Sequence, residues 1–309
     1  MTGVAQTRAE RWATAGVFLL PVLFAANMLS ARWAAGWLPP VALATGRWGM
    51  TFILLLPLAV PGIWLARRAL RHEWPSLLLL GALGMGLCGA PVYIAGQTTT
   101  GTNIGLIYAA SPILMVLLDR VGWGQKIRAR QAAGIVLALS GVLAILAKGD
   151  PANLLGLRFT AGDLWVVGAM SSWALYSVLL RHRPSAFDLP ARFALICGFG
   201  VLANLPFLAL EMAAGEVMPA SLGALGMVLF LAVFASVGAF LLHAKVQAVL
   251  GVGRTGVFLY LGPVYNTALA WLLLDEAPQL FHLAGLLLVL PGVWLAATAG
   301  RAATALRKS

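Results

Sequence analysis

The chain alternates between long apolar runs and short polar stretches, and ten of the apolar runs are long enough to cross a membrane as helices. A spanning helix needs about 20 mostly apolar residues, because the hydrocarbon core is about 30 Å thick and each residue rises about 1.5 Å. We place the helices near 13–31, 39–62, 75–96, 102–121, 131–147, 162–180, 190–211, 220–246, 254–274 and 279–299. These spans use most of the 309 residues, so the pattern predicts an all-α polytopic membrane protein without a soluble domain.

The basic residues gather in every second polar stretch. If the N-terminus is cytoplasmic, 17 of the 21 Lys and Arg residues fall in cytoplasmic segments, and only Arg32, Lys148 and Arg158 fall on the other side. Cytoplasmic loops carry an excess of Lys and Arg, so the bias predicts a bacterial inner-membrane protein with both termini in the cytoplasm. It also accounts for the net charge of +11 without nucleic-acid binding. We interpret the first run, 13–30, as a retained helix and not as a cleaved signal peptide, because it has a counterpart in the second half.

Nine of the 11 tryptophans lie near predicted helix ends. An indole ring favours the membrane–water interface because it has both an apolar body and a polar N–H. The tryptophans expected at the two borders are Trp33, Trp37, Trp165 and Trp271 on the outer side and Trp12, Trp64, Trp74, Trp123 and Trp294 on the inner side. Trp48 and Trp173 lie deeper in their spans, so the interface does not explain them.

Two stretches of about forty residues repeat one another without a gap, 151 positions apart. Gly105, Pro112, Ala133, Gly134, Leu137, Leu139, Gly141 and Val142 recur as Gly256, Pro263, Ala284, Gly285, Leu288, Leu290, Gly292 and Val293. With a two-residue slip, Asn27 and Arg32 correspond to Tyr176 and Arg181. We therefore expect two repeats, 1–155 and 156–309, with five helices each.

Because five is an odd number, the second repeat must enter the membrane from the opposite side. Such an inverted repeat lets one fold open to either side of the membrane around a site near its midplane. The architecture therefore favours transport over the alternative of a purely structural membrane protein that has duplicated.

The repeated pattern resembles the EamA module of the drug/metabolite transporter superfamily, over nearly the whole chain. The segments that carry the resemblance are TGRWGMTFILLLPLA (45–59), TNIGLIYAASPILMVLL (102–118), QAAGIVLALSGVLAIL (131–146), AGDLWVVGAMSSWALYSVLLR (161–181) and GRTGVFLYLGPVYNTALAWLLLDE (253–276). Within that superfamily the chain is similar to YddG-type amino-acid exporters. The resemblance implies a central cavity lined chiefly by the first four helices of each repeat. Gln125 departs from the family, whose linker has an acid at this place, as Glu276 does in the second repeat.

The fourth and ninth spans each contain a glycine and a proline near a tyrosine. Glycines allow a helix or a ligand to approach closely, and prolines leave carbonyls without a helical partner. We expect Gly105, Pro112, Gly256 and Pro263 to provide close packing or a hinge. We expect Tyr108, Tyr260 and Asn266 to line the cavity.

The first and sixth spans offer a second group of candidates. Asn27 corresponds to Tyr176, and Trp173 shares a helical face with Tyr176 because three residues separate them. An indole, a phenol and an amide at midplane depth would form a neutral, partly aromatic pocket, although Trp173 could instead pack against lipid or a neighbouring helix. Further cavity candidates are Trp48, Tyr93 and Tyr265.

Arg47 is the one ionisable residue well inside a predicted span. A charge buried in a membrane is costly and is a functional hypothesis by default. Three interpretations remain open for it. Its guanidinium could hold a substrate carboxylate, bond the carbonyls of a broken helix, or reach the outer interface.

Several absences narrow the expected function. No Asp or Glu lies near the middle of a predicted span, which favours a facilitator over a proton-coupled antiporter and disfavours cationic drugs. No phosphate-binding loop occurs, and Cys88 and Cys197 lie in separate apolar runs, so we expect no cofactor, metal or disulfide. An enzyme is disfavoured because no Ser in a G-x-S-x-G setting accompanies His243.

We therefore expect an exporter of small neutral metabolites. Its substrates would be amino acids, namely aromatic ones and other neutral ones such as Thr and Met. The alternatives are nucleosides, proton-coupled multidrug efflux or a channel. We expect the protein to lie in the lipid bilayer as a monomer or weak homodimer.

Overall fold

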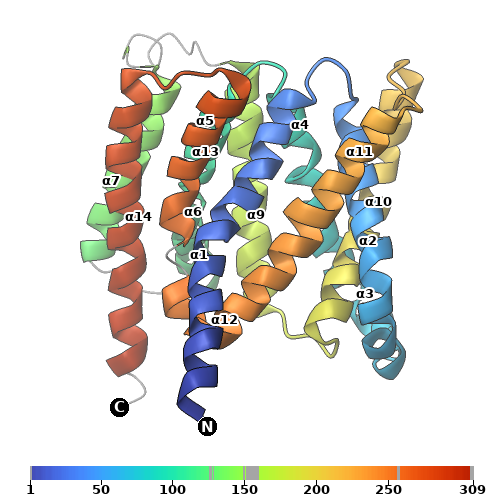
Figure 1. The fold of residues 1–309 in the computed structure, drawn as a ribbon, viewed down its shortest axis with the longest axis horizontal. Helices are drawn as coiled ribbons and strands as arrows, with labels where there is room; N and C mark the ends of the chain where they lie inside the picture. The colour runs from blue at the N-terminus through green and yellow to red at the C-terminus, as the bar shows by residue number, and fades with distance from the viewer. Residues whose placement is uncertain are drawn as a thin grey trace.

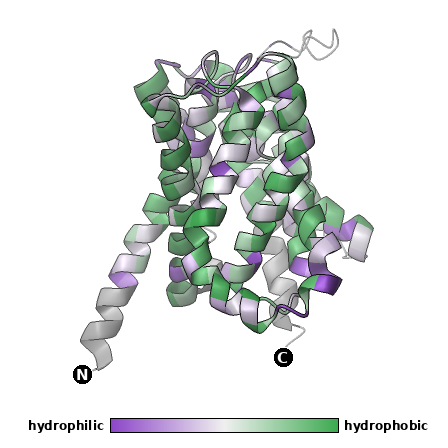
Figure 2. Cartoon of the chain, turned by 90° about the vertical axis from the view of Figure 1, so that its right-hand side faces the viewer, coloured by the Kyte–Doolittle hydropathy of each residue, from purple (hydrophilic) through white to green (hydrophobic). Residues whose placement is uncertain are grey.

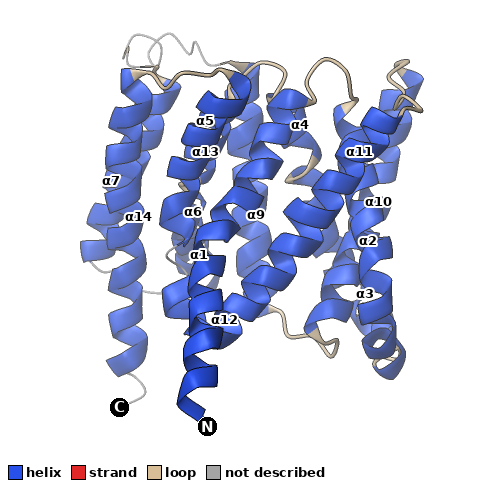
Figure 3. Cartoon of the chain, in the orientation of Figure 1, coloured by secondary structure: helices blue, strands red, loops and turns tan. Residues whose placement is uncertain are grey.

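The computed structural model is built of helices, with no strand among the residues that it describes (Figure 3). It describes the backbone of residues 2–124, 127, 129–148, 150, 160–255 and 258–306. The side chains are described for 10–124, 127, 129–148, 150, 160–250 and 261–295.

The helices group into ten spans, as predicted. The first five spans are α1 (Thr2–Trp33), α2 (Pro40–Leu65), α3–η1–α4 (Leu70–Gly81, Ala82–Leu87 and Ala90–Ala95), α5–α6 (Gly101–Tyr108 and Ser111–Trp123) and α7 (Ala129–Leu146). The other five are α9 (Ala161–His182), α10 (Leu189–Ala213), α11–η2–α12 (Leu222–Phe230, Leu231–Gly238 and Ala239–Thr255), α13 (Phe258–Leu274) and α14 (Leu280–Leu306). Eight of the spans are apolar over at least 18 residues, and Leu261–Leu274 and Leu280–Leu295 are shorter apolar helices.

Three spans differ from the continuous helices that we predicted. The third begins at Leu70 rather than at 75, and the third and eighth each contain a π-helical segment, η1 and η2. Just before η1, the third span lies close to α10, because a side chain at Gly81 would meet the backbone N of Gly200 at 2.5 Å. The fourth span is interrupted between Tyr108 and Ser111, so Pro112 lies in the first turn of a new helix, where its missing N–H has no cost.

The spans stand side by side, and the described ends of α1 and α14 lie at the same end of the bundle (Figure 1). We call this the terminal end, and the other the opposite end. The joined segments α11, η2 and α12 run obliquely across the bundle from the opposite end to the terminal end. Hydrophobic residues cover most of the helices between the two ends of the bundle. The hydrophilic residues gather near the ends themselves (Figure 2).

The tryptophans follow the same layering. All nine that we expected at the borders are exposed by 41% or more, whereas Trp48 is only 8% exposed and Trp173 is partly buried. The two deep tryptophans therefore belong to the interior of the bundle.

The paired helices α7 and α14 form one edge of the bundle (Figure 1). A side chain at Gly141 would meet the carbonyl O of Gly285 at 2.8 Å, and one at Gly292 would meet that of Gly134 at 2.7 Å. Gly285 and Gly292 lie 151 positions after Gly134 and Gly141, and each contacts the counterpart of the other. This reciprocal, antiparallel contact is what an inverted repeat requires. The boundary between residues 155 and 156 stays a prediction.

Candidate functional site

The guanidinium of Arg47 lies in the interior of the bundle, 5% exposed, and bonds to three other spans. Its Nε donates to Ser236 Oγ at 2.9 Å, and one terminal nitrogen donates to Ala235 O at 3.2 Å, both in η2. The other terminal nitrogen donates to Asn27 Oδ1 in α1 and to Tyr93 OH in α4, the latter at 3.1 Å. Tyr93 in turn donates its hydroxyl hydrogen to Asn27 Oδ1 at 3.0 Å.

Local structure explains how Arg47 comes to lie there. Helix α2 starts at Pro40, and its first free amides, Val41 N and Ala42 N, donate to the carboxylate of Glu211 in α10 at 2.8 and 2.7 Å. A carboxylate is favourable at a helix N-terminus, where amides lack helical acceptors. This contact fixes α2 against α10, with Arg47 two turns farther along. The π-helical η2 supplies the carbonyl of Ala235, since π-bulges disturb the regular backbone hydrogen bonds.

The electrostatics of this site are unusual for a membrane interior. The four groups that accept hydrogen bonds from Arg47 are neutral, and among the described side chains no carboxylate forms an ion pair with it. The guanidinium also lies 4.3 Å from the ring centroid of Trp48, a cation–π contact. The indole Nε1 of Trp48 is buried and has no hydrogen-bond partner. The site therefore holds an unneutralised positive charge and an unused donor.

Aromatic residues lie near the charged group. In the third and fourth spans, Cys88 Sγ contacts Tyr108 OH at 3.3 Å. Trp173 and Tyr176 in α9 have ring centroids 5.3 Å apart and belong to one hydrophobic cluster with Trp48. We name Arg47, Asn27, Tyr93, Trp48 and Ser236 the Arg47 site.

Asn27, which we expected in a neutral pocket with Trp173 and Tyr176, binds the guanidinium of Arg47, and the pocket itself stays a prediction. Of the three interpretations of Arg47, the outer interface is excluded by its burial, and the contact with a broken helix is present through Ala235 O. A substrate carboxylate is compatible with this geometry.

The other candidates lie apart from the Arg47 site. Asn266 is 2% exposed and donates from Nδ2 to Gly101 O at 2.6 Å, and it fills the space that Gly105 leaves open. These two residues thus form a helix contact between α5 and α13. Pro263 lies inside the continuous helix α13, and Tyr265 is partly buried there. Gly256 and the side chain of Tyr260 lie outside the described residues.

Sequence reasoning missed two polar groups. One is Ser236, whose signal was its isolation as a lone hydroxyl in an otherwise apolar run. The other surrounds Asp163, which is 0% exposed in the first turn of α9 and whose Oδ1 accepts from Thr99 Oγ1 at 2.5 Å and from Asn103 Nδ2 at 3.1 Å. His282 Nδ1 accepts the Gln279 amide, so its Nε2 carries the hydrogen and donates to Asn103 Oδ1 at 3.0 Å. These contacts join α5, α9 and α14 toward the opposite end.

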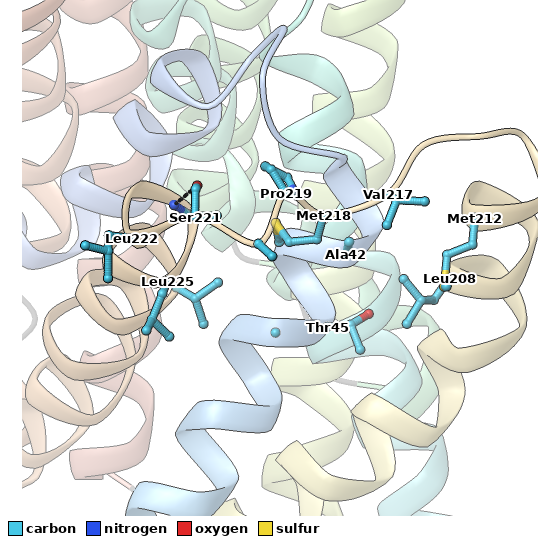
Figure 4. A pocket seen from close by; sticks show the side chains of 14 residues that line it. Ala42, Thr45, Leu208, Met212, Val217, Met218, Pro219, Ser221, Leu222 and Leu225 are labelled. Carbon is cyan, nitrogen blue, oxygen red and sulfur yellow. Dashed lines mark hydrogen bonds between the residues drawn. The ribbon is translucent and has the colours of Figure 1, made fainter.

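A separate cavity of about 720 Å³ lies between α2, α10 and α11 (Figure 4). Its lining is mostly apolar and includes Met212, Met218 and Val228. It reaches the surface, where Leu222 is 88% exposed, and Arg47 does not line it. No group of three or more His, Cys, Asp or Glu that could hold a metal occurs within the described part of the chain.

The model of the EamA-like transporter family matches this chain twice, over residues 11–147 and 160–298. The chain belongs to the EamA-like transporter family. It is 24% identical over 265 residues to an uncharacterized transporter of Bacillus subtilis (strain 168), covering 85% of this chain and 86% of the relative. It is 26% identical over 302 residues to a probable amino-acid metabolite efflux pump of Salmonella typhimurium, covering 90% and 92%. A solved crystal structure, 23% identical, aligns with a TM-score of 0.58 over 94% of this chain and 97% of the other, which supports the fold.

This EamA-like transporter has an ion pair at each end of the bundle. At the opposite end, Arg32 Nε donates to Glu276 Oε1 at 3.0 Å, and Glu276 Oε2 accepts the amide of Gly101 at 2.8 Å. At the terminal end, Asp119 pairs with Arg181 and contacts His182 Nε2 at 3.0 Å. Each pair joins one half of the sequence to the other, and Arg32 and Arg181 are counterparts in the repeat. Both end pairs are formed in this structure.

We expect the Glu276→Gln variant to loosen the opposite end alone. Hydrogen exchange of peptides over residues 96–103 should rise about 3- to 10-fold, since Arg32 is 42% exposed and such a pair contributes only about 1 kcal/mol. Peptides around Asp119 and Arg181 should keep their exchange rates. The control is Glu216→Gln, which changes an exposed acid in the loop after α10. Equal exchange in the wild type and both variants would contradict a stabilising role of the Arg32–Glu276 pair at the opposite end.

Proposed function

We propose that this protein is a bacterial inner-membrane exporter of small metabolites that carry a carboxylate, amino acids first among them. The observation that carries the proposal is the unneutralised guanidinium of Arg47 in the interior of the bundle. A buried cation is costly without an anionic partner. A buried cation without an anionic partner in the protein is therefore suited to bind an anionic substrate group reversibly.

The surroundings of Arg47 suit the exchange of a neutral partner for a carboxylate. Asn27 Oδ1 and Tyr93 OH accept hydrogen bonds from the same terminal nitrogen. A carboxylate in their place would gain charge-assisted hydrogen bonds, which are about twice as strong as neutral ones. The indole N–H of Trp48 offers a further donor, and the Trp173–Tyr176 ring pair offers apolar surface for a side chain.

The repeat supports alternating access as the mechanism. The two halves meet in reciprocal antiparallel contacts at α7 and α14, and one end pair closes each end of the bundle. Opening one pair while the other holds would expose the Arg47 site to one side at a time. The excess of basic residues at the terminal end supports a cytoplasmic location for both termini.

We propose a facilitator, because the acids lie near helix ends and not beside Arg47. The buried Asp163 favours proton coupling as the second candidate, since its Oδ2 is buried without a hydrogen-bond partner. This carboxyl group is therefore the one to test for a transported proton.

A substrate panel in proteoliposomes tests the function. We expect saturable counterflow of phenylalanine, threonine or methionine, with rates that stay within about twofold when a pH gradient is imposed. This follows because a neutral zwitterion moves no net charge, and no proton is required by the Arg47 site. Nucleosides and cationic dyes should not compete. Counterflow of nucleosides without amino acids would contradict the proposal, and strong stimulation by the pH gradient would favour the coupled alternative through Asp163.

A further inference from the structure

The distribution of acidic residues carries a further inference about the substrate. All ten acids of the chain lie in loops or toward the ends of the apolar spans, the first of which begins at Glu10: Glu10, Glu73, Asp119, Asp150, Asp163, Asp188, Glu211, Glu216, Asp275 and Glu276. Several have fixed roles there. Glu73 accepts from Ser185 and the amide of Ala186, Asp188 caps α10, and Glu211 caps α2. Among the hydrogen bonds and ion pairs of the described residues, none joins a carboxylate to a member of the Arg47 site.

An α-ammonium group would therefore meet no carboxylate in the Arg47 site, as far as the structure describes the chain. A substrate carboxylate on Arg47 would bring its own ammonium within a few ångströms of the guanidinium, where like charges repel strongly because the interior screens them poorly. The nearest cation–π partner, the ring of Trp48, already faces Arg47 at 4.3 Å. The rings of Trp173 and Tyr176 contact each other at 5.3 Å.

The Arg47 site offers a cation for a carboxylate but no anion for an ammonium group. We therefore infer that it recognises the carboxylate and an apolar tail of the substrate, and that it does not require the amine. Carboxylates without an amine, such as 2-oxo acids, and N-acylated amino acids are then substrates comparable to the free amino acids. The inference rests on the proposed function, because it assumes that the Arg47 site binds the transported molecule.

A consequence for energetics follows from charge conservation. A free neutral amino acid crosses as a zwitterion with no net charge, whereas a monocarboxylate without an ammonium carries one negative charge outward. A membrane potential that is negative inside favours this export. At equilibrium, each 100 mV supports a ratio of outside to inside concentration of roughly 50. The protein would then need no coupled proton to export such an anion.

Counterflow in proteoliposomes separates the two classes of substrate. Labelled phenylalanine is exchanged against unlabelled phenylalanine, 3-phenyl-2-oxopropanoate, N-acetylphenylalanine or phenethylamine, which lacks the carboxylate. We expect the two amine-modified carboxylates to compete within about threefold of phenylalanine, and phenethylamine to compete at least 10-fold more weakly. Uptake of labelled N-acetylphenylalanine should respond to a potassium diffusion potential set with valinomycin, and uptake of phenylalanine should not.

The outcomes distinguish this inference from the function on which it rests. Phenylalanine counterflow without competition from the amine-modified carboxylates would overturn the inference and leave the exporter intact. Competition by phenethylamine equal to that by phenylalanine would also overturn it. Uptake of N-acetylphenylalanine that ignores the potential would refute export as an anion. If the wild-type protein moves none of the four, the proposed function falls first.

Discussion

Transport of carboxylate-bearing substrates by the Arg47→Gln variant is expected to fall at least about 100-fold. Glutamine keeps polar contact with neighbours such as Ser236 Oγ and Asn27 Oδ1, but it removes the only positive charge of the site. In the complex proposed here, Arg47 forms a buried ion pair with the substrate carboxylate. Removing one partner of such a pair costs about 3 kcal/mol or more, and 1.4 kcal/mol corresponds to a factor of ten. The initial rate of counterflow in proteoliposomes, normalised to the protein incorporated, measures the effect.

Two further variants separate a binding role from a structural one. Arg47→Lys keeps the charge with a compact ammonium in place of the planar fork, so it should retain part of the activity. Arg68→Gln removes an exposed arginine after α2 and should transport as the wild type does. Because no described carboxylate pairs with Arg47, the Arg47→Gln protein should melt within a few degrees of the wild type. Lost transport with a collapsed melting temperature in both Arg47 variants would mean that Arg47 only holds the helices together.

The Gly292→Ala variant is expected to lose stability by about 1–3 kcal/mol, the usual cost of overpacking a tight interface. A methyl group at Gly292 would lie 2.5 Å from Ala138 N and 2.7 Å from Gly134 O. These neighbours belong to the backbone of α7, so relief requires the two helices to separate. Small residues at helix contacts are favourable in membranes because they allow close van der Waals packing.

The matched control is Gly168→Ala in α9, where nothing lies within 4 Å of the added methyl group. This variant should melt at the wild-type temperature or slightly above it, since alanine has the higher helix propensity. Thermal unfolding in detergent, followed by the loss of monodisperse protein, measures both. Equal melting temperatures for the two variants would refute a close contact between α7 and α14.

Part of the predicted site could be read from local pattern, because residue type and depth are properties of one helix. Arg47 stands out as a charge inside a span, and Trp48 as an indole away from the borders, without any knowledge of neighbours. No local pattern shows which residues contact Arg47. Asn27, Tyr93 and Ser236 lie 20, 46 and 189 positions away from it, so only the packing of α1, α2, α4 and η2 brings them together.

Asn266 shows how packing changes the meaning of a residue. Its sequence position beside a proline and a tyrosine suggested a cavity, yet it bonds Gly101 O and fills the space at Gly105. An amide in an apolar helix needs a partner in either case. The residue type alone shows that the amide requires a hydrogen-bond partner. Whether that partner is a ligand or a neighbouring carbonyl depends on which helix lies opposite.

The sequence by itself determined the ten spans, their repeat and the bordering tryptophans, because the bilayer acts on each helix separately through its length and apolarity. Only the tertiary structure decided where helices break and what the buried charge contacts. The π-helical η2 offers Ala235 O to Arg47, and no local pattern in that apolar run predicts it. Such contacts depend on hydrogen bonds between spans, and these form only when the helices have packed.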